Sequence, residues 1–245
     1  MVGRPGAYGL GMSVASALLP AATCAPSVQV HVLNPFRVFV NDHAVDDWPP
    51  GKGRSIFKYL ALHRSQPVPR DVLMGVFWPS VGQDAARNNL NVAIYGLRKA
   101  LARAAPGFTF VRFRQGCYAF DSALRLWVDA EAFIDHLHRA QVAEQRGDAA
   151  GAVADCQAAQ ALYGQPLLAE DRYEDWPIAK RQSLQADFVR VLERLCAHHF
   201  DAGDFEACAS VAQRLLDVDR CDEQAHRTLM RCYSRMGHAH LALRQ

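Results

Sequence analysis

The spacing of apolar residues changes at about residue 126. Before that point, short stretches alternate between apolar and polar residues and are interleaved with helical patterns. After it, almost every apolar stretch has the three-to-four-residue spacing of an amphipathic helix. We therefore expect three regions: a flexible leader over 1–27, an α+β domain over 28–125 and an all-α domain over 126–245.

The α+β region has a definite order of predicted elements. Alternation predicts strands over 28–32, 37–40 and 44–45. Helical spacing predicts helices over 56–63, 71–78 and 84–105, with Ser55 and Asp84 as N-caps. Two β-rich runs, 108–114 and 117–120, flank Gln115-Gly116 and predict a hairpin. Strands, three helices and a terminal hairpin are the parts of a winged helix.

The helix predicted over 84–105 has an unusual polar face. Its apolar stripe consists of Leu90, Ala93, Ile94, Leu97 and Leu101. The opposite face carries amides, a phenol and cations but no carboxylate, and it consists of Asn88, Val92, Tyr95 and Lys99, flanked by Asn91, Arg87 and Arg98. A face that is merely solvated normally mixes both signs of charge, whereas Asn pairs with adenine, Val contacts the thymine methyl and Arg or Lys binds guanine or phosphate. Gly96, on the same side, is expected to let the backbone approach a DNA groove.

The distribution of charge supports a polyanionic partner for the first region. Residues 28–125 hold 13 Lys and Arg against 6 Asp and Glu, whereas residues 126–245 hold 13 against 19. A basic domain is thus joined to an acidic one. We predict that bases are read by Asn88, Asn91, Val92 and Tyr95. We predict that phosphates or the minor groove are contacted by Lys52, Arg54, Arg70, Arg87, Arg98, Lys99, Arg112 and Arg114.

Three segments of the basic region resemble a known family. They are DAARNNL over 84–90, LRKAL over 97–101 and CYAF over 117–120. They resemble the OmpR-type winged helix, in the version found in the antibiotic regulatory proteins of actinobacteria (SARP) and their relatives. One position departs from that pattern, because Cys117 stands where the family usually has Gly. The resemblance implies direct-repeat DNA sites and activation of transcription.

The acidic region contains a repeat. Gly147, Gly203 and Gly237 each follow a predicted helix, and a small residue stands five positions after each of them. The last two glycines are 34 residues apart, which is the tetratricopeptide period. We therefore predict tetratricopeptide-like helix pairs. Because the chain stops inside what should be the second helix of a repeat, we expect further sequence in the natural protein.

A longer interval between the first two repeat glycines contains an insert over 165–177. Its PLL and YEDW segments resemble those of the bacterial transcriptional activator domain, which follows the winged helix in the same regulator family. Tyr173 and Trp176 are candidate partner-binding anchors. The alternative is that these aromatic residues pin the insert onto the helices.

Other functional classes find little support in the sequence. The run GKGRS over 51–55 lacks the Walker spacing, and Glu174-Asp175 form an acid–base site with His198-His199 only by assumption. The seven cysteines form no CxxC pair, so we expect neither a metal nor a cofactor. The apolar stretch in the leader is interrupted by Gly11 and Ser13 and is too short to span a membrane. Cysteines within apolar patterns suit a reducing cytoplasm.

The sequence thus predicts a non-enzymatic, cytoplasmic, sequence-specific DNA-binding transcriptional regulator, and an activator in particular. Its expected partners are double-stranded DNA and RNA polymerase subunits or a second copy of the chain, with no membrane. The alternative is a protein-interaction scaffold with little DNA affinity. An acidic residue on the polar face of the third helix would favour the scaffold, and none is present there.

Overall fold

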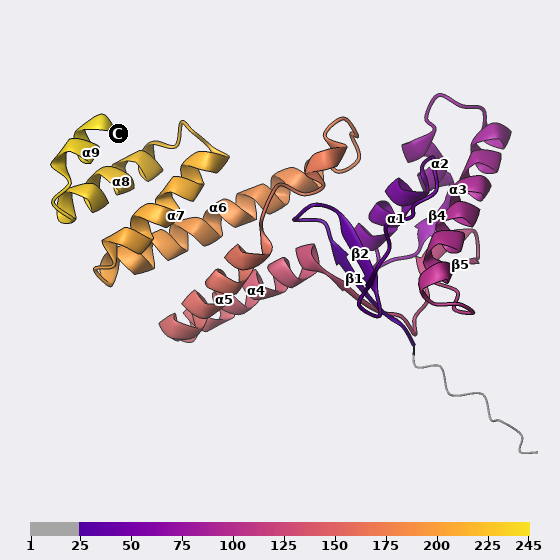
Figure 1. Ribbon diagram of the computed structural model, residues 1–245, viewed down its shortest axis with the longest axis horizontal. Coiled ribbons are helices and arrows are strands. Elements are labelled where there is room, and N and C mark those ends of the chain that lie inside the picture. The colour runs from indigo at the N-terminus through magenta and orange to yellow at the C-terminus, as the bar shows by residue number, and fades with distance from the viewer. Residues whose placement is uncertain (1–24) are drawn as a thin grey trace, which may run out of the picture.

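The computed structural model describes residues 25–245, so the predicted leader lies almost wholly outside the described residues. Figure 1 shows an α+β domain at one end of an elongated molecule and a row of helices extending from it. This arrangement is the predicted winged helix followed by helical repeats. Within the described part of the chain, none of the helices is long and apolar enough to cross a bilayer.

A four-stranded sheet opens the first domain and faces the helical domain. Its strands are β1 (Ser27–His31), β2 (Arg37–Val40), β3 (His43–Ala44) and β7 (Arg125–Val128), in the order β3-β2-β1-β7. The first three are the predicted strands, with β1 and β3 each one residue early. The strand β7 was not predicted, and it pairs in parallel with β1. The sheet therefore continues three residues past the expected domain boundary at 125.

Three helices and a second sheet complete the winged helix. The helices are α1 (Gly53–Leu62), α2 (Arg70–Phe77) and α3 (Gln83–Ala104), and the sheet contains β4 (Val68–Pro69), β5 (Val111–Arg114) and β6 (Cys117–Phe120). The predicted N-caps are wrong, since Ser55 and Asp84 lie inside their helices and the capping positions are Lys52 and Gly82.

The wing is a tight hairpin. Gln115 and Gly116 form its two-residue turn with φ values of 50° and 79°. Two central residues with positive φ match the right-handed twist of the flanking strands. Cys117 lies in β6 rather than in the turn, so the departure from the family pattern falls outside the bend.

Helix α3 packs closely against α1 through glycines. A Cβ atom at Gly53 would lie 3.0 Å from the carbonyl oxygen of Ala93, so a larger residue there would push α1 and α3 apart by a few tenths of an ångström. A Cβ atom at Gly96 would lie 3.0 Å from Cγ of Pro49. Gly96 therefore faces its own chain, which corrects the expectation that it approaches a DNA groove.

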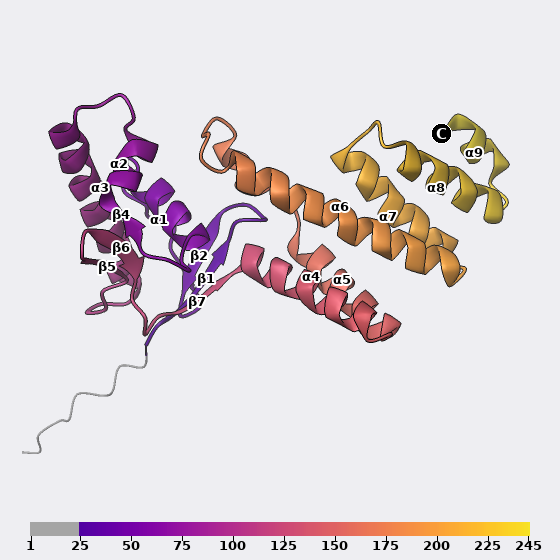
Figure 2. The same cartoon turned by 180° about the vertical axis from the view of Figure 1, so that it is seen from behind.

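The second domain consists of antiparallel helix pairs. Its helices are α4 (Asp129–Gln145), α5 (Ala149–Leu162), α6 (Ile178–Asp201), α7 (Phe205–Val218), α8 (Glu223–Arg235) and α9 (Ala239–Arg244). As predicted, Gly147, Gly203 and Gly237 form the turns within the pairs, each with a φ between 74° and 78°. Figure 2 shows the pairs stacking side by side, away from the winged helix. The insert forms the connection between α5 and α6 and contains a short 3₁₀ helix, Ala169–Asp171.

Candidate nucleic-acid interface

The outer face of α3 is open to solvent. Val92 and Tyr95 expose 72% and 68% of their surface, although most large apolar side chains of this domain are buried. Asn88 and Asn91 are exposed beside them, and Lys99 continues the face one turn on. On the opposite side, Leu90, Ile94, Leu97 and Leu101 are buried in the core, as the periodicity predicts. The four residues expected to read bases therefore share one accessible surface.

Three guanidinium groups surround a hollow next to this face. Arg70 comes from the start of α2, and Arg87 and Arg98 come from α3. The hollow has a volume of about 300 Å³, and its other lining residues are Asn91, Ile94, Tyr95, Phe113 and Tyr118. It thus lies where α2, α3 and the wing meet.

The positive charge around the hollow is only weakly compensated. Arg98 uses its Nε to donate to the carbonyl oxygen of Val111, 3.0 Å away, which ties α3 to the wing. Asp71 lies 3.6 Å from Arg70 and Asp84 lies 4.0 Å from Arg87, and both carboxylates are exposed. Such distant, solvated pairs are worth little. A phosphate group is the natural complement of such a hollow, because guanidinium groups bind phosphate through paired hydrogen bonds.

The two wing arginines have different environments. Arg114 is exposed and forms no ion pair within residues 25–245. Arg112 pairs with Asp121, which is only 6% exposed. The N–H of Ala123 and the guanidinium of Arg112 lower the pKa of the Asp121 carboxyl. Arg112 thus neutralises a buried carboxylate at the base of the wing.

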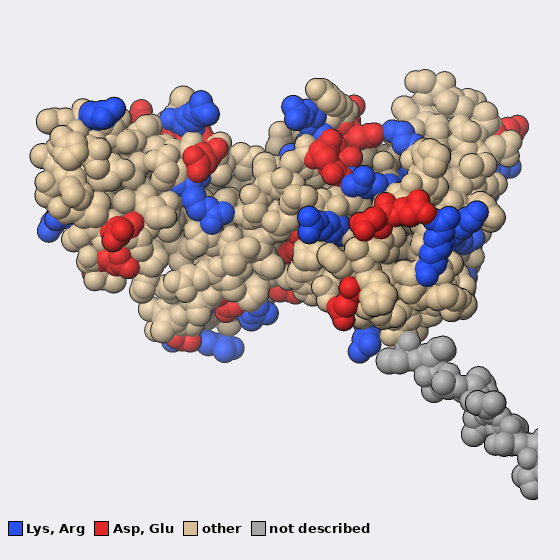
Figure 3. Space-filling view, viewed as in Figure 1, with Lys and Arg blue, Asp and Glu red and all other residues tan. Residues whose placement is uncertain are grey.

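Lys52 and Arg54, at the start of α1, are paired with the second domain. Nζ of Lys52 lies 2.7 Å from Glu174, and Arg54 lies 2.8 Å from Glu170. Figure 3 shows acidic side chains gathered at the connection between α5 and α6, with basic side chains beside them. Of the eight predicted backbone-contacting cations, five remain on the α3 and wing surface: Arg70, Arg87, Arg98, Lys99 and Arg114.

The sequence reasoning missed Lys58. This lysine is only 2% exposed, and its Nζ lies 2.6 Å from Asp171 and 2.5 Å from Glu170. One signal was available in the sequence, because Lys58 interrupts an otherwise apolar stretch of α1. A lysine in such a position rarely stays buried without a carboxylate partner.

The two candidate partner-binding aromatics occupy different environments. The ring centroid of Trp176 lies 5.2 Å from that of Tyr59 and 6.2 Å from that of Phe77. Trp176 therefore pins the insert, but onto α1 and α2 of the winged helix rather than onto the repeats. Tyr173 exposes 89% of its surface and is available to a partner.

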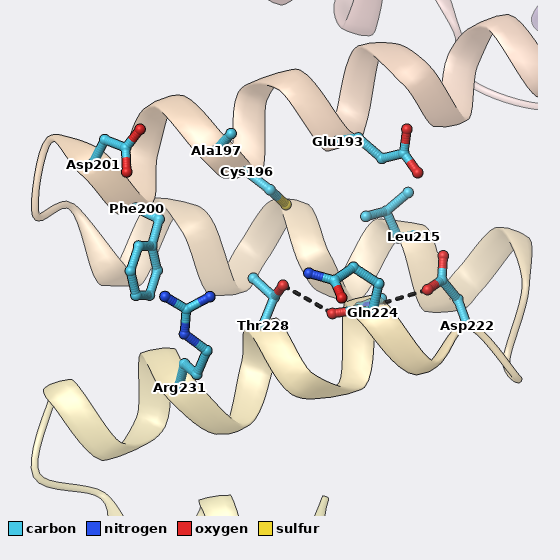
Figure 4. A pocket seen from close by; sticks show the side chains of 11 residues that line it. Glu193, Cys196, Ala197, Phe200, Asp201, Leu215, Asp222, Gln224, Thr228 and Arg231 are labelled. Atoms are coloured by element: carbon cyan, nitrogen blue, oxygen red, sulfur yellow. Dashed lines mark hydrogen bonds between the residues drawn. The ribbon is translucent and has the colours of Figure 1, made fainter.

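A second hollow lies in the helical domain between α6 and α8. It measures about 320 Å³, and Figure 4 shows Arg231 of α8 directed toward Phe200 of α6 across it. The guanidinium carbon lies 4.1 Å from the centre of that ring. Asp222, at one end, accepts a hydrogen bond from the N–H of Ala225 and so caps α8. No group of His, Cys, Asp and Glu suited to a metal ion occurs in the described part of the chain.

Comparison with known proteins supports both domains. Residues 128–245 match the family model of the bacterial transcriptional activator domain. The fold is similar to EmbR of Mycobacterium tuberculosis, whose structure was solved in complex with a low-affinity phosphopeptide. The TM-score is 0.71 at 19% identity, over 89% of this chain and 57% of the EmbR chain. Comparison with curated proteins gave no match.

The EmbR similarity extends across the winged helix as well as the repeats, because it covers 89% of this chain. At this level of identity it shows the fold, and this chain spans little more than half the length of EmbR. The family match describes the second domain independently. The second domain thus matches the bacterial transcriptional activator domain, and the fold of the chain, a winged helix followed by helical repeats, is similar to that of EmbR.

Proposed function

We propose that this protein is a sequence-specific DNA-binding regulator that activates transcription in the cytoplasm without catalysing a reaction. In this proposal α3 enters the major groove and the wing lies over the adjacent backbone or minor groove. The observation that carries the proposal is the outer face of α3, which exposes amides, Val92 and Tyr95 beside a hollow lined by three arginines and holds one carboxylate, Asp84, in its first turn. A surface of this kind attracts a polyanion and offers amides to base edges.

The residues of this surface have separate roles in the proposal. Bases are read by Asn88, Asn91, Val92 and Tyr95. Phosphates are held by Arg70, Arg87, Arg98, Lys99 and Arg114. Because Arg112 neutralises Asp121, we assign it to the positioning of the wing rather than to direct contact with DNA.

The activator domain supplies the second part of the function. We propose that it contacts RNA polymerase subunits or a second copy of the chain, with Tyr173 as an exposed anchor. A tyrosine that exposes 89% of its surface beside a fixed scaffold has the amphipathic character of residues that dominate protein interfaces. The scaffold alternative shares this partner surface but predicts no DNA affinity.

Selection from a random-sequence pool of duplexes tests the proposal. Fragments retained by the protein should share a motif, and their affinity should fall steeply with salt. Five phosphate contacts predict a slope of about −4.5 for log affinity against log salt. The variant Arg87→Glu should weaken binding to every fragment. A pool that yields no motif, together with an affinity that is insensitive to salt, would favour the scaffold.

A further inference from the structure

A segment of the second domain lies across the start of α1. We name residues 170–176, in the connection between α5 and α6, the acidic strap. Three of its carboxylates meet three cations of α1, in the pairs Glu174 with Lys52, Glu170 with Arg54 and Lys58, and Asp171 with Lys58. Every cation in the first two turns of α1 is therefore neutralised by the strap.

The inner part of this contact, around Lys58 and Asp171, is buried and holds the strap on α1. Nζ of Lys58 lies 4.4 Å from the ring centre of Phe36, and the Lys58 and Asp171 side chains are 2% and 18% exposed. Trp176 packs beside this pair on Tyr59 and Phe77. Separation of a buried pair leaves uncompensated charge in the interior, so this part holds the strap in place.

The outer part of this contact, around Lys52 and Arg54, is exposed to solvent, so its ion pairs can exchange one anion for another. The Lys52 and Glu174 side chains are 38% and 31% exposed, and those of Arg54 and Glu170 are 40% and 41% exposed. Ion pairs at this exposure contribute little to stability, and salt screens them. Lys52 and Arg54 can therefore exchange these carboxylates for another anion, although Glu170 also pairs with the buried Lys58.

The exchangeable cations lie where α1 packs against α3. Gly53, between Lys52 and Arg54, packs on the backbone of Ala93 and on Leu97, at the inner edge of α3. The two cations also stand at the positive end of the α1 dipole, which favours anions. A duplex that follows α3 would bring its backbone toward this end of α1.

We propose that the acidic strap withholds Lys52 and Arg54 from DNA, with Glu174 and Glu170 in the places of two backbone phosphates. This inference rests on the proposed DNA binding. The strap thus reduces the affinity of the protein for any duplex, and the two cations become phosphate ligands only when their carboxylates are removed or drawn away.

The variant Glu174→Gln tests the strap against the matched control Asp175→Asn. Both variants remove one negative charge, but Asp175 is exposed and has no ion pair in the described chain. Binding to a random-sequence duplex is measured by fluorescence anisotropy between about 50 mM and 200 mM salt. Glu174→Gln should bind about 3- to 10-fold more tightly at the low-salt end, with a slope steeper by about 0.9. Asp175→Asn should match the wild type, and Lys52→Gln/Glu174→Gln should return to the wild-type slope.

The outcomes separate this inference from the proposed function. Wild-type binding with equal slopes for Glu174→Gln and Asp175→Asn would overturn the strap alone, and weaker binding by Glu174→Gln would show that the strap supports the DNA domain instead. Absence of binding by every variant would overturn the proposed function together with the strap. Thermal melting confirms that the compared variants are equally folded.

Discussion

At the scale of single residues, substitutions of two nearby asparagines on α3 distinguish a side chain that reads bases from one that is merely polar and exposed. Asn91 lies on the proposed base-reading face, whereas Asn89 is exposed outside it. We expect Asn91→Ala to cost about 1–3 kcal/mol on a selected DNA site and little on random duplex. Asn89→Ala should leave both affinities unchanged. If Asn91→Ala lowered the affinity for selected and random DNA equally, Asn91 would not be a base-reading residue.

The wing arginines give a second pair of contrasting residues. Arg114 is exposed and forms no ion pair in the described chain, so Arg114→Ala should weaken binding to selected and random duplexes alike. The salt slope should become shallower by about 0.9, and the melting temperature should fall less than in Arg112→Ala, because Arg114 acts on Asp121 only through its charge. Anisotropy titrations and thermal melting measure the two quantities. Unchanged affinity would exclude the wing from the interface.

Arg112→Ala should instead affect stability. It leaves the buried Asp121 carboxylate without its guanidinium partner, and we expect a loss of about 1–3 kcal/mol in unfolding free energy. Because the folded state lowers the pKa of Asp121, the carboxylate stabilises the fold above its unfolded pKa of about 3.9. That contribution is lost as the pH falls through the folded pKa. The stability difference between wild type and Asp121→Asn, measured by urea unfolding, should therefore be constant near neutrality and shrink below about pH 4.

The sequence correctly predicted the exposure or burial of single residues where the spacing of apolar residues along one helix determines it. The exposure of Val92 and Tyr95 and the burial of Leu97 follow from the position of each on one helix. The neutralisation of Lys52 and Arg54 did not follow, because their partners lie 122 and 116 residues away. An ion pair across such a separation depends on how two domains dock, and neither local sequence contains that information.

At the scale of elements, glycine substitutions test the contact between α1 and α3. Gly53→Ala gains up to about 1 kcal/mol of helix propensity, but its Cβ would lie 3.0 Å from a backbone oxygen of α3. Backbone cannot move aside cheaply, so we expect a net loss of stability. Gly75→Ala in α2 meets nothing within 4 Å and should stabilise the protein by about 0.5–1 kcal/mol. Urea unfolding compares the two, and a stabilising Gly53→Ala would contradict the close packing.

The elements that the sequence predicted share strong local signals. The apolar stripe gave α3 within one residue at each end, and Gln115-Gly116 gave the wing turn. The strand β7 was not predicted because it pairs in parallel with β1, which lies almost a hundred residues earlier. No hairpin turn connects the two strands, so no local sequence signal indicates that they pair. The helix caps were misplaced because capping depends on backbone geometry at one residue, which an Asp or Ser near a helix start does not determine.

At the scale of the whole molecule, the turn after β1 joins the two domains. Asp129, the first residue of α4, accepts hydrogen bonds of 2.8–3.0 Å from the N–H groups of Val32 and Leu33. Burial raises the pKa of Asp129, and these hydrogen bonds oppose the rise. From the other side, the N–H of Leu168 donates to the carbonyl oxygen of Val32. Hydrogen bonds on both sides of one turn, together with the strap, fix the repeats relative to α3.

This shared turn predicts that both domains unfold together. The four tryptophans lie in or against the winged helix, so their fluorescence reports the first domain, whereas far-UV circular dichroism reports mainly the repeats. The two signals should give one coincident transition.

Asp129→Ala leaves two buried N–H groups without an acceptor and should lower the free energy of unfolding by about 2–5 kcal/mol, equally in both signals. The control Glu223→Ala removes an exposed pair with Arg227 and should cost less than about 1 kcal/mol. Two separate transitions in the wild type would mean that the turn does not couple the domains, and that α3 is free to reorient relative to the activator domain.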